Sequence, residues 1–189
     1  MKITGTKKLT SDAMLAAMCA VLGIAARFLD FGFIKVSIES LPVLVAALLF
    51  GPLDGAAVAL IGTFLSQLLL YGLDPSTPLW ILPYVVIAII CGFYARKYKF
   101  YNTTGQIRFI VSSMEVLIFA LNTVSLYLYA EFVNYFNTQW IGETGKAYVL
   151  SGLFPRIVML IIKAVLFSFL MPPILRALHR IRRNTQTES

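Results

Sequence analysis

Long stretches with almost no charged residue constrain the fold of this chain more than any other feature. Asp12 is the only charge between Leu9 and Ala26. No charge lies in 40–53, 55–73 or 75–95. Crossing a hydrocarbon core of about 30 Å takes roughly 20 apolar residues per helix. Only 13% of the 189 residues are charged, whereas a soluble domain carries about a quarter. The sequence therefore predicts an all-α integral membrane protein.

The apolar stretches predict six membrane-spanning helices in a single domain over residues 1–189. We expect them near 10–29, 38–52, 54–73, 79–96, 108–135 and 148–178. The second is short and opens close to Pro42. Proline and glycine place turns after the second and third spans, at 50–55 and 74–78. No signal peptide is expected, because Met1 to Asp12 is polar and no small-residue cleavage site follows.

Lysine and arginine orient the spans, because both are enriched in cytoplasmic loops. With the N-terminus inside, the cytoplasmic side collects Lys2, Lys7, Lys8, Arg96, Lys97, Lys99, Arg108, Arg176, Arg180, Arg182 and Arg183. The outer loops hold only Lys35 and Lys146. This bias predicts an even number of spans, with both termini cytoplasmic. Contact with anionic lipid headgroups is a secondary role for these residues, and a nucleic-acid partner is not expected.

No motif typical of catalysis, nucleotide binding or metal binding occurs in the sequence. Cys19 and Cys91 fall inside spans, where packing is the expected role. The lone His179 lies among terminal arginines. No Walker loop, HExxH motif or Cys/His cluster occurs. We therefore expect no catalytic residue, no bound metal and no cofactor in this chain, which is not expected to be an enzyme.

Four ionisable residues fall within or at the edges of spans, where each costs about 2.5–3.5 kcal/mol at mid-membrane without a partner or a wet cavity. Arg27 lies three residues before Asp30, so these two could pair or snorkel at the outer surface. Arg156 and Lys163 lie seven residues apart on one face of the last span. They predict a polar pocket open to the outside; snorkelling at the helix end is the alternative, and it fits Arg156 better than Lys163. Glu115 lies in the fifth span.

The partner of Lys163 can be argued from depth. Glu115, Asn122 and Tyr129 recur every seven residues along the fifth span. Counted from the basic residues at the inner ends of the two spans, Asn122 lies at nearly the depth of Lys163, and Glu115 about 10 Å nearer the cytoplasm at 1.5 Å per residue. We therefore expect Lys163 to pair with Asn122 or a ligand before Glu115.

Aromatic and amide side chains gather on the outer side, where they fit either an interfacial belt or a ligand site. Beside the cations, aromatic walls with a few polar anchors suit a flat heterocyclic ligand. The predicted ligand-binding residues are Arg27, Gln67, Trp80, Tyr84, Asn122, Arg156 and Lys163. Tyr71, Asn134, Tyr135 and Trp140 lie in the same outer regions.

The first span carries a small-residue strip formed by Ala13, Ala16, Ala17 and Ala20. Such a strip lets another helix approach closely, which contact with lipid does not require. It predicts either internal packing or a docking surface for a partner protein.

Several short motifs resemble the substrate-capturing S components of energy-coupling factor (ECF) vitamin transporters. Residues 34–42, which end in Leu41-Pro42, and the run Leu49-Phe50-Gly51-Pro52-Leu53-Asp54-Gly55 are similar to the "LP…LFGPxxG" pattern of the folate-type, hydroxymethylpyrimidine-type and related branches. Phe154-Pro155-Arg156 is similar to the "PR" that opens their last helix. The size, the six spans and the alanine strip also fit this family.

The resemblance implies a vitamin-binding subunit in a bacterial plasma membrane. It would capture its ligand from outside and dock through the alanine strip on a membrane scaffold served by two ATPases, which use ATP. Toppling in the bilayer would then release the ligand inside.

Two ligand-facing regions, 62–67 and 73–80, depart from the folate branch, which tends to carry an Asp in the third helix. We expect a hydroxymethylpyrimidine- or pyridoxine-like compound first, folate second and riboflavin third. The alternatives are a small intramembrane enzyme of lipid metabolism that uses Glu115, and a structural membrane subunit.

Overall fold

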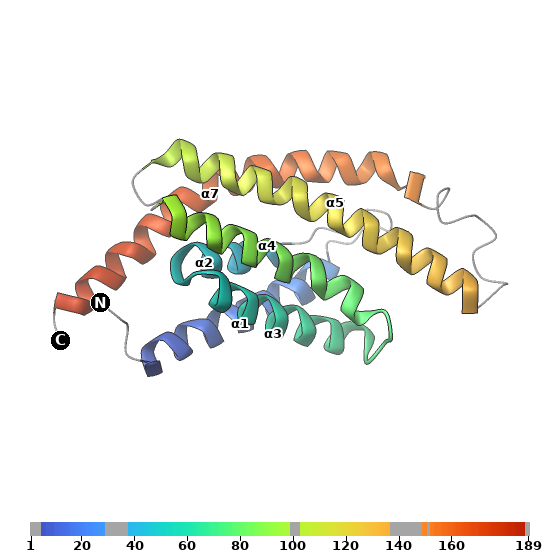
Figure 1. Cartoon of the computed structure of the whole chain (residues 1–189), viewed down its shortest axis with the longest axis horizontal. Helices are drawn as coiled ribbons and strands as arrows, with labels where there is room; N and C mark the ends of the chain where they lie inside the picture. The colour runs from blue at the N-terminus through green and yellow to red at the C-terminus, as the bar shows by residue number, and fades with distance from the viewer. Residues whose placement is uncertain (1–4, 29–37, 99–102, 137–148, 151, 188–189) are drawn as a thin grey trace.

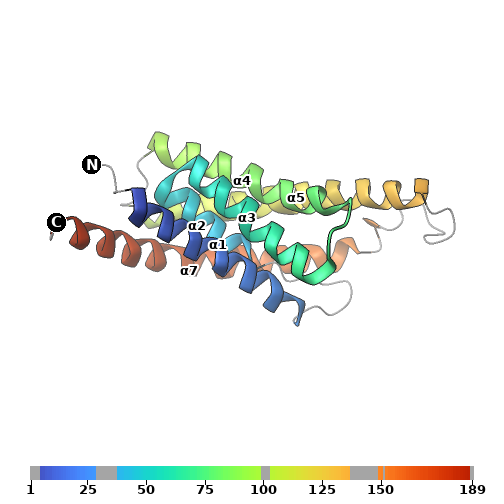
Figure 2. The same cartoon turned by 90° about the horizontal axis from the view of Figure 1, so that it is seen from below.

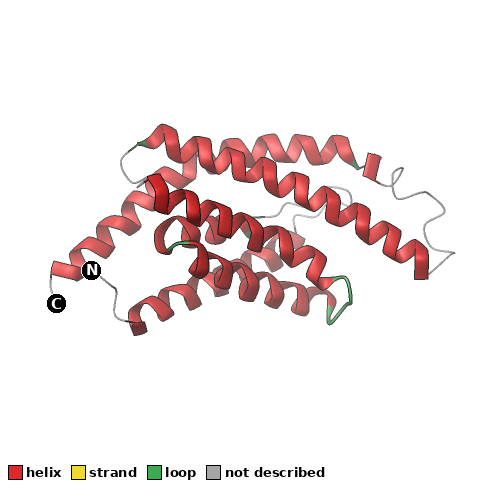
Figure 3. Ribbon diagram, in the orientation of Figure 1, coloured by secondary structure: helices red, strands yellow, loops and turns green. Residues whose placement is uncertain are grey.

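A computed structural model describes residues 5–28, 38–98, 103–136, 149–150 and 152–187. Its helices are α1 (Gly5–Arg27), α2 (Ser40–Phe50), α3 (Pro52–Tyr71), α4 (Thr77–Tyr98), α5 (Thr104–Phe136) and α7 (Leu153–Thr187). No strand occurs in these ranges, and Figure 3 shows helix along almost all of them. The expected positions of Asp30, Lys35, Trp140 and Lys146 lie outside the described residues.

Five of the helices are long and apolar enough to cross a membrane. These spans are Lys8–Arg27, Pro52–Tyr71, Thr77–Lys97, Thr104–Val133 and Leu153–Arg180. With its 11 residues, α2 extends only about 16 Å, or half of a hydrocarbon core. The described residues thus form the all-helical fold of a multi-pass membrane protein, in which the second helix is too short to cross alone.

The helices form an elongated bundle in which α5 and α7 run side by side (Figures 1 and 2). On the other side α3 packs against α1 and α4, while α2 contacts α1, α3, α4 and α7. In both views α1 begins and α7 ends at the same end of the bundle, where α4 ends and α5 begins. Arg96 and Lys97 lie in the last turn of α4. Lysine and arginine therefore collect at this end, which we call the basic end.

The residues of α7 are arranged as expected for a helix in contact with lipid, with apolar side chains on the exposed face. Ile161, Val165 and Phe169 are 58%, 53% and 63% exposed, and they follow one face of the helix at four-residue intervals. On the other face, Lys163 and Phe167 are buried. An apolar outer surface with a charged residue inside is stable only where the surrounding solvent is hydrocarbon.

A tight turn joins α2 to α3 at the basic end. Gly51 adopts φ +108°, a conformation that residues with a Cβ rarely reach, and its N–H donates to the carbonyl oxygen of Ala47 at 3.1 Å. Pro52 then occupies the first turn of α3, where its missing N–H costs nothing. The side chain of Arg96 covers Gly51, and Lys8 of α1 pairs with Asp54 of α3 at 2.6 Å. These contacts hold the start of α3 beside the start of α1 and the end of α4.

The loop between α3 and α4 is ordered by Asp74. Its carboxylate accepts a hydrogen bond from the backbone N–H of Ser76 at 2.7 Å, and its carbonyl oxygen accepts one from the N–H of Thr77 at 2.9 Å. The hydrogen bond to the charged carboxylate lowers the pKa of Asp74 below its ordinary value. This turn, predicted from the prolines at 75 and 78, leads directly into α4.

Close packing of α1 on α3 depends on residues without bulk. A Cβ added at Gly62 would lie 2.5 Å from the Cβ of Cys19 and 2.9 Å from the carbonyl oxygen of Ala16. Cys19 and Cys91 are both free and buried in the core. The backbones of α1 and α3 therefore approach to a distance that only glycine permits at this crossing.

We expect Gly62→Ala to destabilise the protein by about 1–3 kcal/mol, because the added methyl group must push α1 away from α3. The measurement is thermal unfolding of the purified protein in detergent. Gly105→Ala in α5 is the matched control, since a Cβ there meets nothing within 4 Å. Equal unfolding temperatures for the two variants would contradict the packing argument.

Candidate functional site

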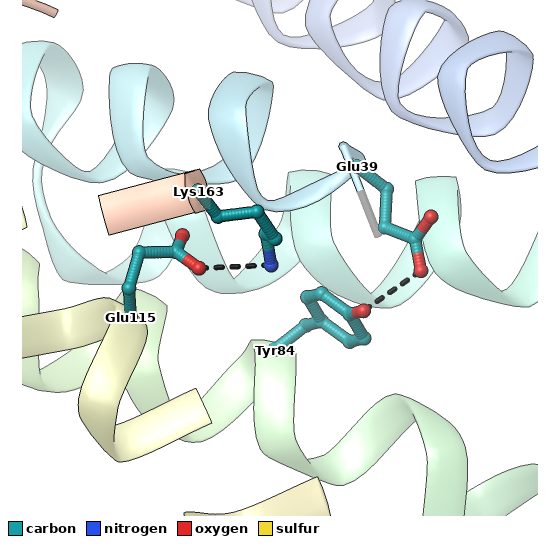
Figure 4. A network of polar contacts seen from close by, with 4 residues as sticks. All are labelled: Glu39, Tyr84, Glu115 and Lys163. Atoms are coloured by element: carbon teal, nitrogen blue, oxygen red, sulfur yellow. Dashed lines mark hydrogen bonds and ion pairs between the residues drawn. The ribbon is translucent and has the colours of Figure 1, made fainter. Parts of the chain in front are cut away.

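A buried ion pair joins α7 to α5. The Nζ atom of Lys163 lies 2.8 Å from Oε2 of Glu115, and the two residues are 7% and 1% exposed. Figure 4 shows the ammonium and the carboxylate pointing toward one another. Nearer the basic end, the hydroxyls of Ser112 and Ser168 are hydrogen-bonded at 2.8 Å across the same two helices. The polar pairs thus follow one antiparallel register.

The expectation that Lys163 pairs with Asn122 before Glu115 was wrong. The depth of Asn122 was counted from Arg108, taken as level with Arg176. In the structure α5 begins at Thr104, and the guanidinium of Arg176 donates to the hydroxyl of Thr104. The two helices are therefore offset by about one turn from the assumed register, which brings Glu115 to the level of Lys163.

A second polar contact lies beside this ion pair. The hydroxyl of Tyr84, on α4, donates to Oε1 of Glu39 at 2.7 Å, and these residues are 4% and 3% exposed. Glu39 immediately precedes α2. Because α2 starts at Ser40 and runs about 16 Å to its end at the basic end, Glu39 lies near the middle of the bundle.

The second carboxylate oxygen of Glu39 has no hydrogen-bond partner among the described residues. It is directed toward α1 and α3, since a Cβ added at Gly23 would lie 3.4 Å from Oε2 of Glu39 and 3.0 Å from Oγ of Ser66. The thiol of Cys19 lies 3.5 Å from the carbonyl oxygen of Glu39. A buried carboxylate oxygen without a donor is unfavourable, so this atom marks a position where a hydrogen-bond donor is needed.

Sequence reasoning did not select Glu39. The signal was available: an acidic residue one position inside the edge of an expected span, 38–52, next to Ser40 and Leu41-Pro42. Hydropathy alone does not show how deep the edge of a span lies, and the short helix α2 places Glu39 in the interior.

The pair of Glu39 and Tyr84 lies beside the pair of Glu115 and Lys163, where the start of α2 meets α4, α5 and α7 (Figure 4). We call these four residues the central network. It contains two carboxylates and one ammonium, and the ammonium is already 2.8 Å from Glu115. In an apolar bundle such charges are stable only when they are paired or hydrogen-bonded.

Other expected ligand-binding residues lie at separate helix contacts. The guanidinium of Arg27 is 5.1 Å from the centroid of the Tyr71 ring, and that of Arg156 is 5.6 Å from the Phe119 ring. The ring of Trp80 is 5.7 Å from that of Tyr129. Gln67 is buried and Asn122 half-buried. Of the seven residues, only Tyr84 and Lys163 belong to the central network.

The alanine strip of α1 divides between two faces. Ala16 and Ala20 are buried, while Ala13 and Ala17 are exposed. Met14, Met18 and Val21 are exposed around the latter pair. The two interpretations of the strip therefore concern different residues. Ala16 and Ala20 serve internal packing, and only Ala13 and Ala17 are accessible to a partner.

Comparison with known proteins gives one result that covers most of the chain. The model of the family described as ECF transporter, substrate-specific component, matches residues 7–175. The matched range includes nearly all of α1, the whole of α2 to α5, most of α7 and all four residues of the central network. No curated protein matches the chain.

We expect Lys163→Met to lower the stability of the protein by about 3–5 kcal/mol, because Glu115 is left as a buried and unpaired charge. Adding Glu115→Gln to this variant should recover most of the loss. Thermal unfolding in detergent measures both effects. Lys8→Met is the control, since its pair with Asp54 is partly exposed and is worth about 1 kcal/mol or less. A Lys163→Met variant no less stable than Lys8→Met would refute the importance of the buried pair.

Proposed function

The chain belongs to the family of ECF transporter substrate-specific components, and from this premise we propose that it captures a small aromatic heterocyclic vitamin or vitamin precursor. The match over residues 7–175 carries the proposal. Members of this family are transporter subunits rather than enzymes. They bind a small-molecule substrate and work with a scaffold and an ATPase module.

The finer assignment concerns the ligand and the topology. We propose a hydroxymethylpyrimidine- or pyridoxine-like ligand first, folate second and riboflavin third. It would enter from outside a bacterial plasma membrane, and the basic end of the bundle would face the cytoplasm. All six helices would then lie in the membrane, with α2 enclosed by its neighbours. The aromatic contacts of Arg27, Trp80 and Arg156 support an outer wall for the site, and Gln67, Tyr84, Asn122 and Lys163 are proposed to line its interior.

The proposed docking surface is the exposed face of α1. Ala13 and Ala17 lie on this face, and their small side chains allow a helix of the scaffold to approach closely. Ala16 and Ala20 support the surface from behind through their packing in the bundle. Two ATPase subunits bound to the scaffold would supply the energy from ATP, since no nucleotide-binding motif occurs in this sequence.

The alternative of a lipid-metabolism enzyme using Glu115 is not favoured. Glu115 is 1% exposed and is held by Lys163, so it is a poor acid or base for an external substrate. A structural subunit, the other alternative, would bind no small molecule.

We expect the purified protein to carry a vitamin or vitamin precursor in near-stoichiometric amount. A tight binder retains its ligand through purification, because most differences in affinity are differences in the dissociation rate. Denaturation followed by mass spectrometry of the extract identifies the compound. An empty extract, together with no binding of any vitamin in calorimetry, would favour the structural subunit.

We expect Ala17→Trp to abolish uptake in cells that contain the scaffold and ATPases, while ligand binding by the isolated protein stays unchanged. The exposed position accepts the bulk without disturbing the fold, but the scaffold helix can no longer approach. Ile161→Trp is the control, because Ile161 is 58% exposed on a different helix, α7, and not on the docking helix α1. Full uptake by Ala17→Trp would exclude this surface. Uptake by the chain without its partners would exclude the proposed function.

A further inference from the structure

We propose that Glu39 binds the hydrogen-bond-donor edge of the ligand's heterocycle, an amino group beside a ring nitrogen as in an aminopyrimidine. This inference rests on the proposed function and names the chemical class that the site selects. It starts from Oε2 of Glu39, which is buried and has no hydrogen-bond partner among the described residues.

The central network leaves this oxygen in need of a donor. Oε1 of Glu39 already accepts the hydroxyl of Tyr84 at 2.7 Å. The cation of the network, Lys163, lies 2.8 Å from Glu115, and moving it to Glu39 would leave Glu115 as a buried, unpaired carboxylate. A ligand N–H group satisfies Glu39 without breaking the ion pair, and charge-assisted hydrogen bonds of this kind are the stronger ones.

The position of Glu39 suits a specificity-determining residue. It lies at the start of α2, near the middle of the bundle, and Tyr84 fixes its side chain from α4. Its second oxygen is directed to the junction of α1 and α3, beside Ser66. A carboxylate held by packing and by one hydrogen bond keeps its remaining lone pairs in a fixed direction, and this favours one arrangement of donors in a ligand.

A carboxylate accepts two parallel N–H bonds most effectively from a planar group that presents two adjacent donors. Aminopyrimidines can present such an edge, with the amino group and a protonated ring nitrogen, and so can the aminopteridine ring of folate. The flavin ring presents a single N–H between two carbonyl groups, whose oxygens would repel a carboxylate. The site should therefore accept aminopyrimidines or folate and disfavour riboflavin.

Binding to the unmodified protein tests the proposal directly. Calorimetry would compare 4-amino-5-hydroxymethyl-2-methylpyrimidine and folate with their analogues in which oxygen replaces the ring amino group. We expect the better of the two amino compounds to bind at least about tenfold more tightly than its oxo analogue, since a buried acceptor discriminates strongly against a missing donor. Equal affinities for the amino and oxo members of both pairs would overturn the proposal.

A matched pair of variants identifies the residue. Glu39→Gln and Glu131→Gln remove one negative charge by the same isosteric change, and Glu131 is exposed on α5. We expect Glu39→Gln to weaken binding of the amino compound at least about tenfold and Glu131→Gln to leave it unchanged. Unchanged affinity in Glu39→Gln would exclude Glu39 as the anchor. Thermal unfolding confirms that both variants fold, and if Glu39→Gln does not, the analogue comparison decides.

The variant Arg156→Ala helps to distinguish the two candidate ligands that carry this hydrogen-bond-donor edge, folate and the hydroxymethylpyrimidine. Folate also carries carboxylates, which need a cation, whereas the hydroxymethylpyrimidine does not. Calorimetry with each compound identifies the ligand, and Arg156→Ala should weaken the binding of folate more than that of the small pyrimidine. Tight binding of a vitamin without an amino edge, insensitive to Glu39→Gln, would overturn this inference and leave the proposed function standing. Failure of every vitamin to bind would overturn both.

Discussion

The ion pair between Lys163 and Glu115 is the interaction on which much of the bundle depends. A charge inside an apolar bundle is tolerated only with a partner, so these residues fix the height at which α7 meets α5. The hydrogen bond between Ser112 and Ser168 and the contact of Arg176 with Thr104 follow the same register. With Lys163 turned inward, the middle of α7 can expose isoleucine, valine and phenylalanine to lipid.

The other side of the bundle, formed by α1, α3 and α4, is held together by close packing at residues that lack a side chain. Gly62 and Gly23 bring α3 and α1 together, and a Cβ at Gly55 or Gly92 would also collide with the neighbouring backbone at Ala47 or Pro52. Such close approach encloses α2 on several sides. A helix of 11 residues can then begin near mid-membrane, where its preceding residue, Glu39, is kept from both water and lipid.

Hydropathy and charge were enough to predict an all-helical membrane protein, because the cost of burying charge in lipid is large and acts on every span. Hydropathy located the helices, and each expected range coincides largely with one of them. It could not fix the register of α5 against α7, since Glu115 lies about 10 Å, or two turns, from the depth assumed for Lys163. It also could not show that α2 starts inside the bundle, which depends on close contacts made by Gly55, Gly62 and Gly92. The alanine strip illustrates the same limit, because spacing alone does not say which face of α1 is covered by α3.

The position of Glu39 connects the two proposals about this protein. The thiol of Cys19 lies against the backbone of Glu39, and Gly23 lies against its carboxylate. Both residues belong to α1, the helix whose opposite face carries Ala13 and Ala17. A ligand donor bound to Glu39 would therefore lie against the inner face of the proposed docking helix. Any shift of α1 on the scaffold would change the surroundings of the carboxylate, so docking and ligand release would act on the same helix through its two faces.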